Sequence, residues 1–275
     1  MRSRTAVTCG VTLLLTVSLL GQQGQRPARK DGQPDIEGYY QMSGMAGSGG
    51  LFVEPLPPSL QGRRSSPGIV LDPPDGQIPY LPWARARRDE VRDHYAAPNT
   101  AQVDTRNRGW PDGVPRINFY FVNPFQILQP EGAVLILYEA QHEFRHIPLD
   151  GRPQPDSDVK LWMGSSRAHW EGKTLVVTVT NINDRVRFSV MGDFASSDLK
   201  VTERWTWVDP DTISYTATLE DPKVYSRPWT AGTTIKRIKE KGFELMEYSG
   251  VEGEKDAHLM VDIPATLKKA ETDKK

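Results

Sequence analysis

One short run of this sequence has the residue types and the spacing of a zinc site. His142, Glu143 and His146 form the pattern H-E-x-x-H, which on a helix places two imidazoles one turn apart with the glutamate as a base. The context favours a strand, because an apolar run ends at Tyr138 and Pro148 follows the motif. In a strand the two histidines share a face, so they stay candidates for a catalytic or ligand-binding pair. Ordinary strand histidines are the plainer interpretation, and we assign no metal and no cofactor.

Glu203 is the second candidate for catalysis. In the strand expected over 199–208 its side chain shares a face with four apolar ones, those of Leu199, Val201, Trp205 and Trp207. If that face is the interior, the buried carboxylate must pair with a cation such as Arg227 or Arg237, or carry a raised pKa useful for proton transfer. We favour the ion pair. An enzyme would use Glu203 with a histidine such as His142, His146 or His169.

Aromatic residues are concentrated in the second half of the chain: Trp170, Trp205, Trp207, Tyr215, Tyr225 and Trp229. They either fill the core or line a cavity for a planar or sugar-like ligand. In the second case Tyr225, Arg227 and Trp229 would supply anchors at a barrel mouth.

The elements that must hold these residues are β-strands joined by short polar turns. We expect strands over 117–122, 125–129, 133–140, 143–149, 161–163, 168–171, 174–182, 199–208, 212–219, 233–238 and 243–248, after a first strand at 35–42. A small hairpin is expected to pair 68–71 with 77–80. Such a meander hides its edges most simply by closing, so we predict an all-β, antiparallel, lipocalin-like up-and-down barrel. A two-sheet sandwich is the alternative.

One helix is expected, over 82–96, where Pro82 can occupy the first turn. Its apolar stripe is thin, and we place its charged residues, Arg88 among them, on the exposed side. This pattern predicts a surface helix that covers one end of the sheet.

The chain opens with a basic segment and a short apolar run, which together resemble a secretory signal over 1–24. A polar spacer over 25–34 leads to one β-barrel domain over 35–250, with an irregular insertion at 43–66, and a charged tail at 251–275. We therefore expect an exported protein, periplasmic or secreted. The one cysteine, Cys9, lies within the signal, so the mature chain has no thiol for catalysis, metal ligation or disulfides.

The formal net charge of −1 gives no reason to expect nucleic acid as a partner. No membrane span is expected in the mature chain, and the sequence leaves the oligomeric state open. Glycine loops for nucleotides and the G-x-S-x-G pattern of hydrolases do not occur.

Several motifs together resemble a large family of exported bacterial proteins without an assigned activity. They are DPPDGQIPY at 72–80, GVPR at 113–116, WEGKTLVV at 170–177, EDPK at 220–223 and RPW at 227–229. Members of that family carry two cysteines where this chain has Gly109 and Gly250. The resemblance implies a disulfide lost as a unit, and hence that these two glycines lie close together.

Three hypotheses about function follow. The first is an exported β-barrel that binds a small apolar or aromatic molecule without catalysis. The second is an exported, metal-independent lyase, isomerase or hydrolase that uses Glu203 and a histidine. The third is a structural protein of the cell envelope.

Overall fold

The computed structural model describes residues 29, 32–43, 52–55, 68–95, 102–119 and 124–248. Ten strands and one α-helix, with three short 3-10 helices, occur in this part of the chain. The strands are β1 (Gly38–Ser43), β2 (Val70–Asp72), β3 (Phe125–Leu128), β4 (Ala133–Tyr138), β5 (Phe144–Pro148), β6 (Ser165–Glu171), β7 (Thr174–Thr180), β8 (Lys200–Asp209), β9 (Thr212–Glu220) and β10 (Trp229–Arg237). The helices are α2 (Pro82–Asp93), η1 (Thr105–Arg108), η2 (Arg116–Phe119) and η3 (Ala140–His142).

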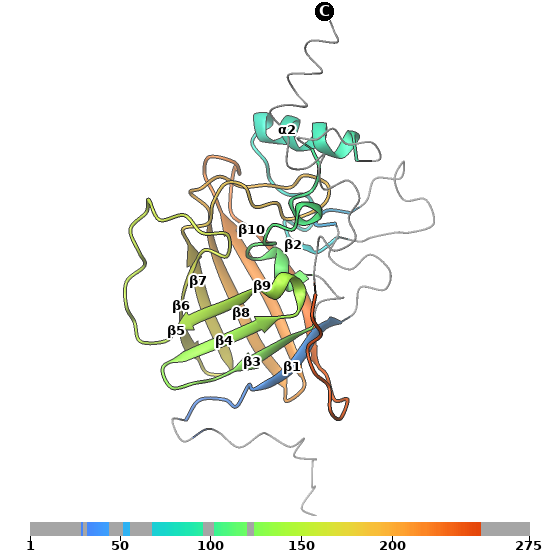
Figure 1. Ribbon diagram of the computed structural model, residues 1–275. Helices are drawn as coiled ribbons and strands as arrows, with labels where there is room; N and C mark the ends of the chain where they lie inside the picture. The colour runs from blue at the N-terminus through green and yellow to red at the C-terminus, as the bar shows by residue number, and fades with distance from the viewer. Residues whose placement is uncertain are drawn as a thin grey trace, which may run out of the picture.

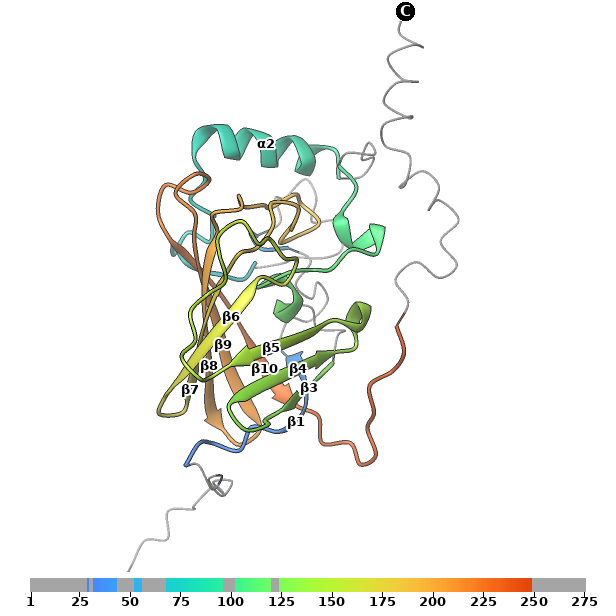
Figure 2. The ribbon, with the colours of Figure 1, turned by 60° about the vertical axis from the view of Figure 1, so that its left-hand side comes forward.

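The strands form a single antiparallel sheet that curls into a nearly closed barrel (Figures 1 and 2). The order around the barrel is β5-β4-β3-β1-β10-β9-β8-β7-β6, and the short β2 pairs with β10 beside this path. Sequential neighbours pair from β3 to β5 and from β6 to β10, and β1 joins these two halves by pairing with both β3 and β10. The predicted antiparallel meander is therefore confirmed, and the sandwich alternative is wrong.

Between β5 and β6, where backbone pairing stops, a side-chain hydrogen bond connects the two ends of the sheet. No ladder joins β5 to β6 in the described part of the chain. Arg145 of β5 instead donates a hydrogen bond of 3.0 Å to the hydroxyl of Ser166 on β6. Because both side chains are buried, this bond crosses the seam from inside the barrel.

Alternation along the strands decides which residues face the interior. In β8, Val201, Glu203 and Trp205 are at most 1% exposed, whereas Lys200 and Arg204 lie outside. The expected inward face of this strand is thus confirmed, with Glu203 among its apolar neighbours.

The helix α2 lies across one end of the barrel, which we call the α2 end (Figures 1 and 2). Its role as a cover was expected, but its charged face was assigned wrongly for Arg88. That side chain is 2% exposed and forms ion pairs with Glu54 and Asp193. The carboxylates of two other segments draw it inward, and no pattern within the helix indicates their presence.

Four expected elements differ in the structure. Residues 116–119 form η2, and the remainder of the strand expected at 117–122 lies outside the described residues. Leu161 makes a single bridge, to Ile182, instead of a strand. Residues 243–248 do not pair as a strand, because their backbone N–H groups turn to side chains: Met246 donates to Glu139 and Tyr248 to His142. The expected small hairpin does not form, because Val70 and Asp72 pair with β10 and Tyr80 bridges to Tyr225.

The expected signal over 1–24, nearly all of the insertion at 43–66 and the tail at 251–275 lie outside the described residues. Among the residues that are described, no helix combines the length and the hydropathy that crossing a membrane requires.

Candidate functional site: an arginine pocket at the α2 end

Glu203 lies at the centre of a buried polar network inside the barrel. Its Oε1 atom accepts hydrogen bonds from Arg145 (3.0 Å), Asn118 (2.9 Å) and the Tyr215 hydroxyl (2.7 Å). A second guanidinium nitrogen of Arg145 donates to Oε2 at 2.5 Å. Tyr138 donates to Asn118 at 2.8 Å and completes the group. The expected ion pair is present, and it comes from a strand that lies 58 residues away in sequence.

The cation that meets Glu203 differs from both expected ones. Arg227 is exposed and pairs with Asp72, whereas Arg237 lies near Asp211. Burial disfavours the charge on Arg145, but Glu203 and the neighbouring phenols outweigh that cost and raise the pKa of the guanidinium. Burial also raises the pKa of Tyr215 well above its usual range. Both groups therefore keep their protons at physiological pH, and the network is suited to locking the core rather than to transferring protons.

The histidines of the H-E-x-x-H run lie away from Glu203. His142 belongs to the β4–β5 turn, is exposed, and accepts a hydrogen bond of 3.3 Å from the Tyr248 N–H. His146 is exposed on the outside of β5, and His169 is exposed beside Glu171. The part of the chain that the structure describes contains no group of three His, Cys, Asp or Glu side chains placed to hold a metal ion. The catalytic trio named from sequence is thus not brought together.

The aromatic candidates divide between the core and the surface. Trp205 packs against Tyr215 and Phe125, with ring centroids 4.7 Å and 6.1 Å apart. Trp207, Tyr225 and Trp229 are also buried, whereas Trp170 is only half-buried, against Trp207. Ring-on-ring packing of this kind favours the role of core filling.

Glu143, the glutamate of the H-E-x-x-H run, should make the free energy of unfolding depend on pH. Burial, and then the nearby Asp112 carboxylate, raise its pKa to about 7, from 4.5 for an ordinary glutamate. Between these two values the unfolded chain loses a proton that the folded chain keeps, so the free energy of unfolding falls as the pH rises from 4.5 to 7. Solvent screening of this half-buried group limits the effect to about 1 kcal/mol. Urea unfolding at pH 4.5, 6 and 7.5 should show that the free energy of unfolding falls less with pH in Glu143→Gln than in wild type. An equal fall in the two proteins would contradict this assignment.

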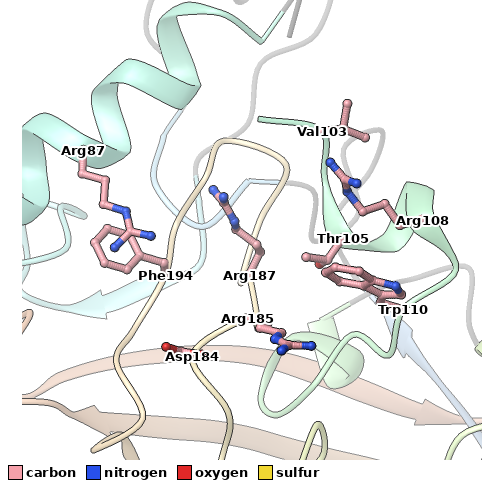
Figure 3. Close-up of a pocket in the computed structure, with 9 residues that line it drawn as sticks. All are labelled: Arg87, Val103, Thr105, Arg108, Trp110, Asp184, Arg185, Arg187 and Phe194. Carbon is pink, nitrogen blue, oxygen red and sulfur yellow. The ribbon is translucent and has the colours of Figure 1, made fainter. Parts of the chain in front are cut away.

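A pocket of about 380 Å³ opens at the α2 end, and sequence reasoning did not identify it (Figure 3). Three segments that are distant in sequence build it: α2, the residues around η1, and the β7–β8 connection. Its lining consists of Arg87, Val103, Thr105, Arg108, Trp110, Asp184, Arg185, Arg187 and Phe194. Four guanidinium groups therefore face one carboxylate.

One buried arginine, Arg116, connects two of these segments through an ion pair and a hydrogen bond. Arg116, with no exposed surface, donates to both carboxylate oxygens of Asp104, at 2.9 and 3.1 Å. It also donates to the backbone carbonyl of Arg187 at 3.2 Å. Asp104 in turn accepts the N–H of Arg106 and caps η1. Arg116 is thus a positioning residue that fixes the η1 segment against the β7–β8 connection.

Three of the pocket arginines lack a countercharge. Arg87, Arg185 and Arg187 form no ion pair within the described chain, nor does Asp184. Most arginines elsewhere in the described residues pair with carboxylates: Arg29, Arg85, Arg88, Arg92, Arg106, Arg116, Arg145, Arg152, Arg204, Arg227 and Arg237. Arg167 is the exception among them, and it donates to carbonyl and hydroxyl oxygens instead. Burial, and then repulsion by Arg87 and Arg116, lower the pKa of Arg187 despite the attraction of Asp104. Within the described residues the pocket therefore holds three arginines that form no ion pair.

Local sequence gave only a faint signal for this site. Asn183 and Asp184 had the pattern of turn formers, and the Asn183 side chain does accept the Arg185 N–H at 3.0 Å. The pattern Arg-x-Arg at 185–187 follows directly, but its partners on α2 and near η1 come from about 80 to 100 residues earlier.

No family model, no curated protein and no solved structure matches the chain. The resemblance to an exported bacterial family therefore stays a prediction. Gly250 lies outside the described residues, so its expected approach to Gly109 stays one too. The last described residues do run near that loop, since the Arg106 guanidinium lies 6.0 Å from the Tyr248 ring centre.

Proposed function

We propose that this chain is an exported β-barrel protein that binds a small anionic molecule in the arginine pocket at the α2 end. The proposal keeps the binding role and the export expected from sequence. It moves the site from the barrel interior to the loops above it, and it changes the ligand from an apolar molecule to a negatively charged one.

The observation that carries the proposal is that Arg87, Arg185 and Arg187, around a cavity of about 380 Å³, form no ion pair with any residue that the structure describes. A guanidinium group stays charged in proteins and offers a planar fork of donors that matches carboxylate and phosphate. Arg187 is the group for which this matters most, because burial lowers its pKa and repulsion by Arg87 and Arg116 adds to that effect. An anionic ligand would offset the burial of the Arg187 charge, and the volume falls within the range of small-molecule sites.

The chemistry of the pocket favours binding over catalysis. A hydrolase or lyase needs a group that exchanges a proton near neutral pH within reach of the substrate. Apart from the arginines, Asp184 is the titratable residue among those that line the cavity. Glu203 and the histidines considered for catalysis are not part of this lining. We therefore assign recognition of an anion to this site and no reaction.

Removal of the Arg187 charge should weaken binding of a phosphate monoester at least tenfold. Arg187 is the most enclosed of the three unpaired arginines, and a hydrogen bond to a charged group contributes about 1.5–3 kcal/mol. The measurement is isothermal titration of wild type and Arg187→Gln with phenyl phosphate and methyl phosphate at low ionic strength. Phenol and methanol serve as the uncharged counterparts.

Arg204→Gln is the matched control, because it removes a guanidinium that lies outside the barrel on β8 and pairs with Glu171. It should bind both phosphate esters as wild type does. Binding of phenol as tight as that of phenyl phosphate would contradict the proposal, and so would the absence of binding by either ester.

A further inference from the structure

We propose that the ligand of the arginine pocket is a planar aromatic anion, whose ring lies against Trp110 while its charged group meets Arg185 and Arg187. This inference deepens the proposed function and rests on it: the pocket must bind anions at all before the shape of the anion matters.

The size of the cavity indicates more than a bare anion. A water molecule takes about 30 Å³ in the liquid, so a cavity of about 380 Å³ has room for about a dozen water-sized groups. A phosphate or carboxylate group alone would leave most of this space to water. A charged group attached to one or two rings would occupy it.

The walls supply flat surfaces at two places. The Arg87 guanidinium lies 4.5 Å from the centre of the Phe194 ring, and the Arg108 guanidinium lies 5.6 Å from that of Trp110. In the view of Figure 3, Phe194 and Trp110 stand on opposite sides, with Arg185 and Arg187 between them. Stacked guanidinium groups and rings present planar faces, which an aromatic ligand can extend.

Phe194 and Trp110 differ in how much ring surface each leaves open to a ligand. Phe194 is 5% exposed and packs against Tyr80 and Trp83, so its ring is largely committed to the cover of the barrel. Trp110 is only half-buried and rests on Trp162, with ring centroids 5.3 Å apart. Its indole is held in place from one side and leaves surface for the ligand. The geometry thus assigns the ring to Trp110 and the charge to the arginines beside it.

The test compares two ligands of equal charge that differ in the ring. Titration of wild type should give a lower Kd for phenyl phosphate than for methyl phosphate, by about three- to tenfold. Trp110→Leu, which keeps an apolar side chain but removes the ring, should reduce that ratio to near one. Thermal unfolding of both proteins checks that the variant is folded.

The outcomes separate this inference from the function on which it rests. Equal affinity of wild type for the two esters would overturn the aromatic ligand and leave the anion-binding function standing. A preference for phenyl phosphate that persists in Trp110→Leu would overturn the assigned wall. Failure of both esters to bind would overturn the function and the inference together.

Discussion

Glu203→Leu should lower the free energy of unfolding by about 3–5 kcal/mol, because it leaves the Arg145 charge buried without its partner. Both side chains are at most 3% exposed, and the carboxylate accepts bonds from Arg145, Asn118 and Tyr215. Arg145 also bridges the seam to Ser166. The substitution therefore weakens the interior at the seam between β5 and β6, where the described residues form no backbone ladder.

A double-mutant cycle separates the ion pair from simple packing. Arg145→Met alone should cost a similar amount, since it leaves the Glu203 carboxylate without its cation. The pair Arg145→Met with Glu203→Leu should recover much of the loss, because two apolar side chains of similar size replace two opposed charges. Urea unfolding at pH 7 measures all three variants. A loss below about 1 kcal/mol for Glu203→Leu would show that Arg145 reaches water without its partner.

Arg116→Met is the second substitution for which we expect a large effect. It should lower the free energy of unfolding and also disturb the arginine pocket. Arg116 is fully buried, donates twice to Asp104 and lies 3.7 Å from Asp112. Its removal leaves two buried carboxylates short of positive charge, at a cost of about 3–5 kcal/mol near neutral pH. It also releases the Arg187 carbonyl, so the arginine that should bind the anion loses its backbone support.

The pH dependence of this stability loss distinguishes the missing positive charge of Arg116 from a packing defect. Burial already raises the pKa of Asp112 in the native protein, and the loss of Arg116 should raise it further. Because a protonated carboxyl needs no cation, the deficit of Arg116→Met relative to wild type should shrink as the pH falls from 7 toward 4. Arg204→Met, at an exposed position, should show neither the deficit nor its pH dependence. A deficit that stays constant over this range would contradict the electrostatic account.

The barrel could be predicted because strands and turns carry their signals locally. The β-branched run at 174–180 and the alternation at 199–208 were enough to place β7 and β8, and the inward face of Glu203 followed from the period of two. The helix was placed within a few residues by Pro82 and by the charged residues that follow. Each of these signals lies within one element.

The wrong exposure of Arg88 and the wrong partner of Glu203 share one physical origin, which is tertiary pairing of charged side chains. Arg88 lies buried because Glu54 and Asp193 meet it, and Arg145 lies inside the barrel because Glu203 is there. Neither partner is close in sequence. The pocket is assembled from one helix and two loop segments that are distant in sequence, and side-chain direction in loops follows no period, so its arginines could be counted from sequence but not brought together.

Native mass spectrometry of the protein purified from the cells that produce it tests the central claim most directly. Wild type should retain a small organic anion, and Arg187→Gln purified in parallel should have lost it, while Arg204→Gln keeps it. A neutral apolar ligand retained equally by all three proteins would contradict the account, because it would place the binding site away from the arginine pocket.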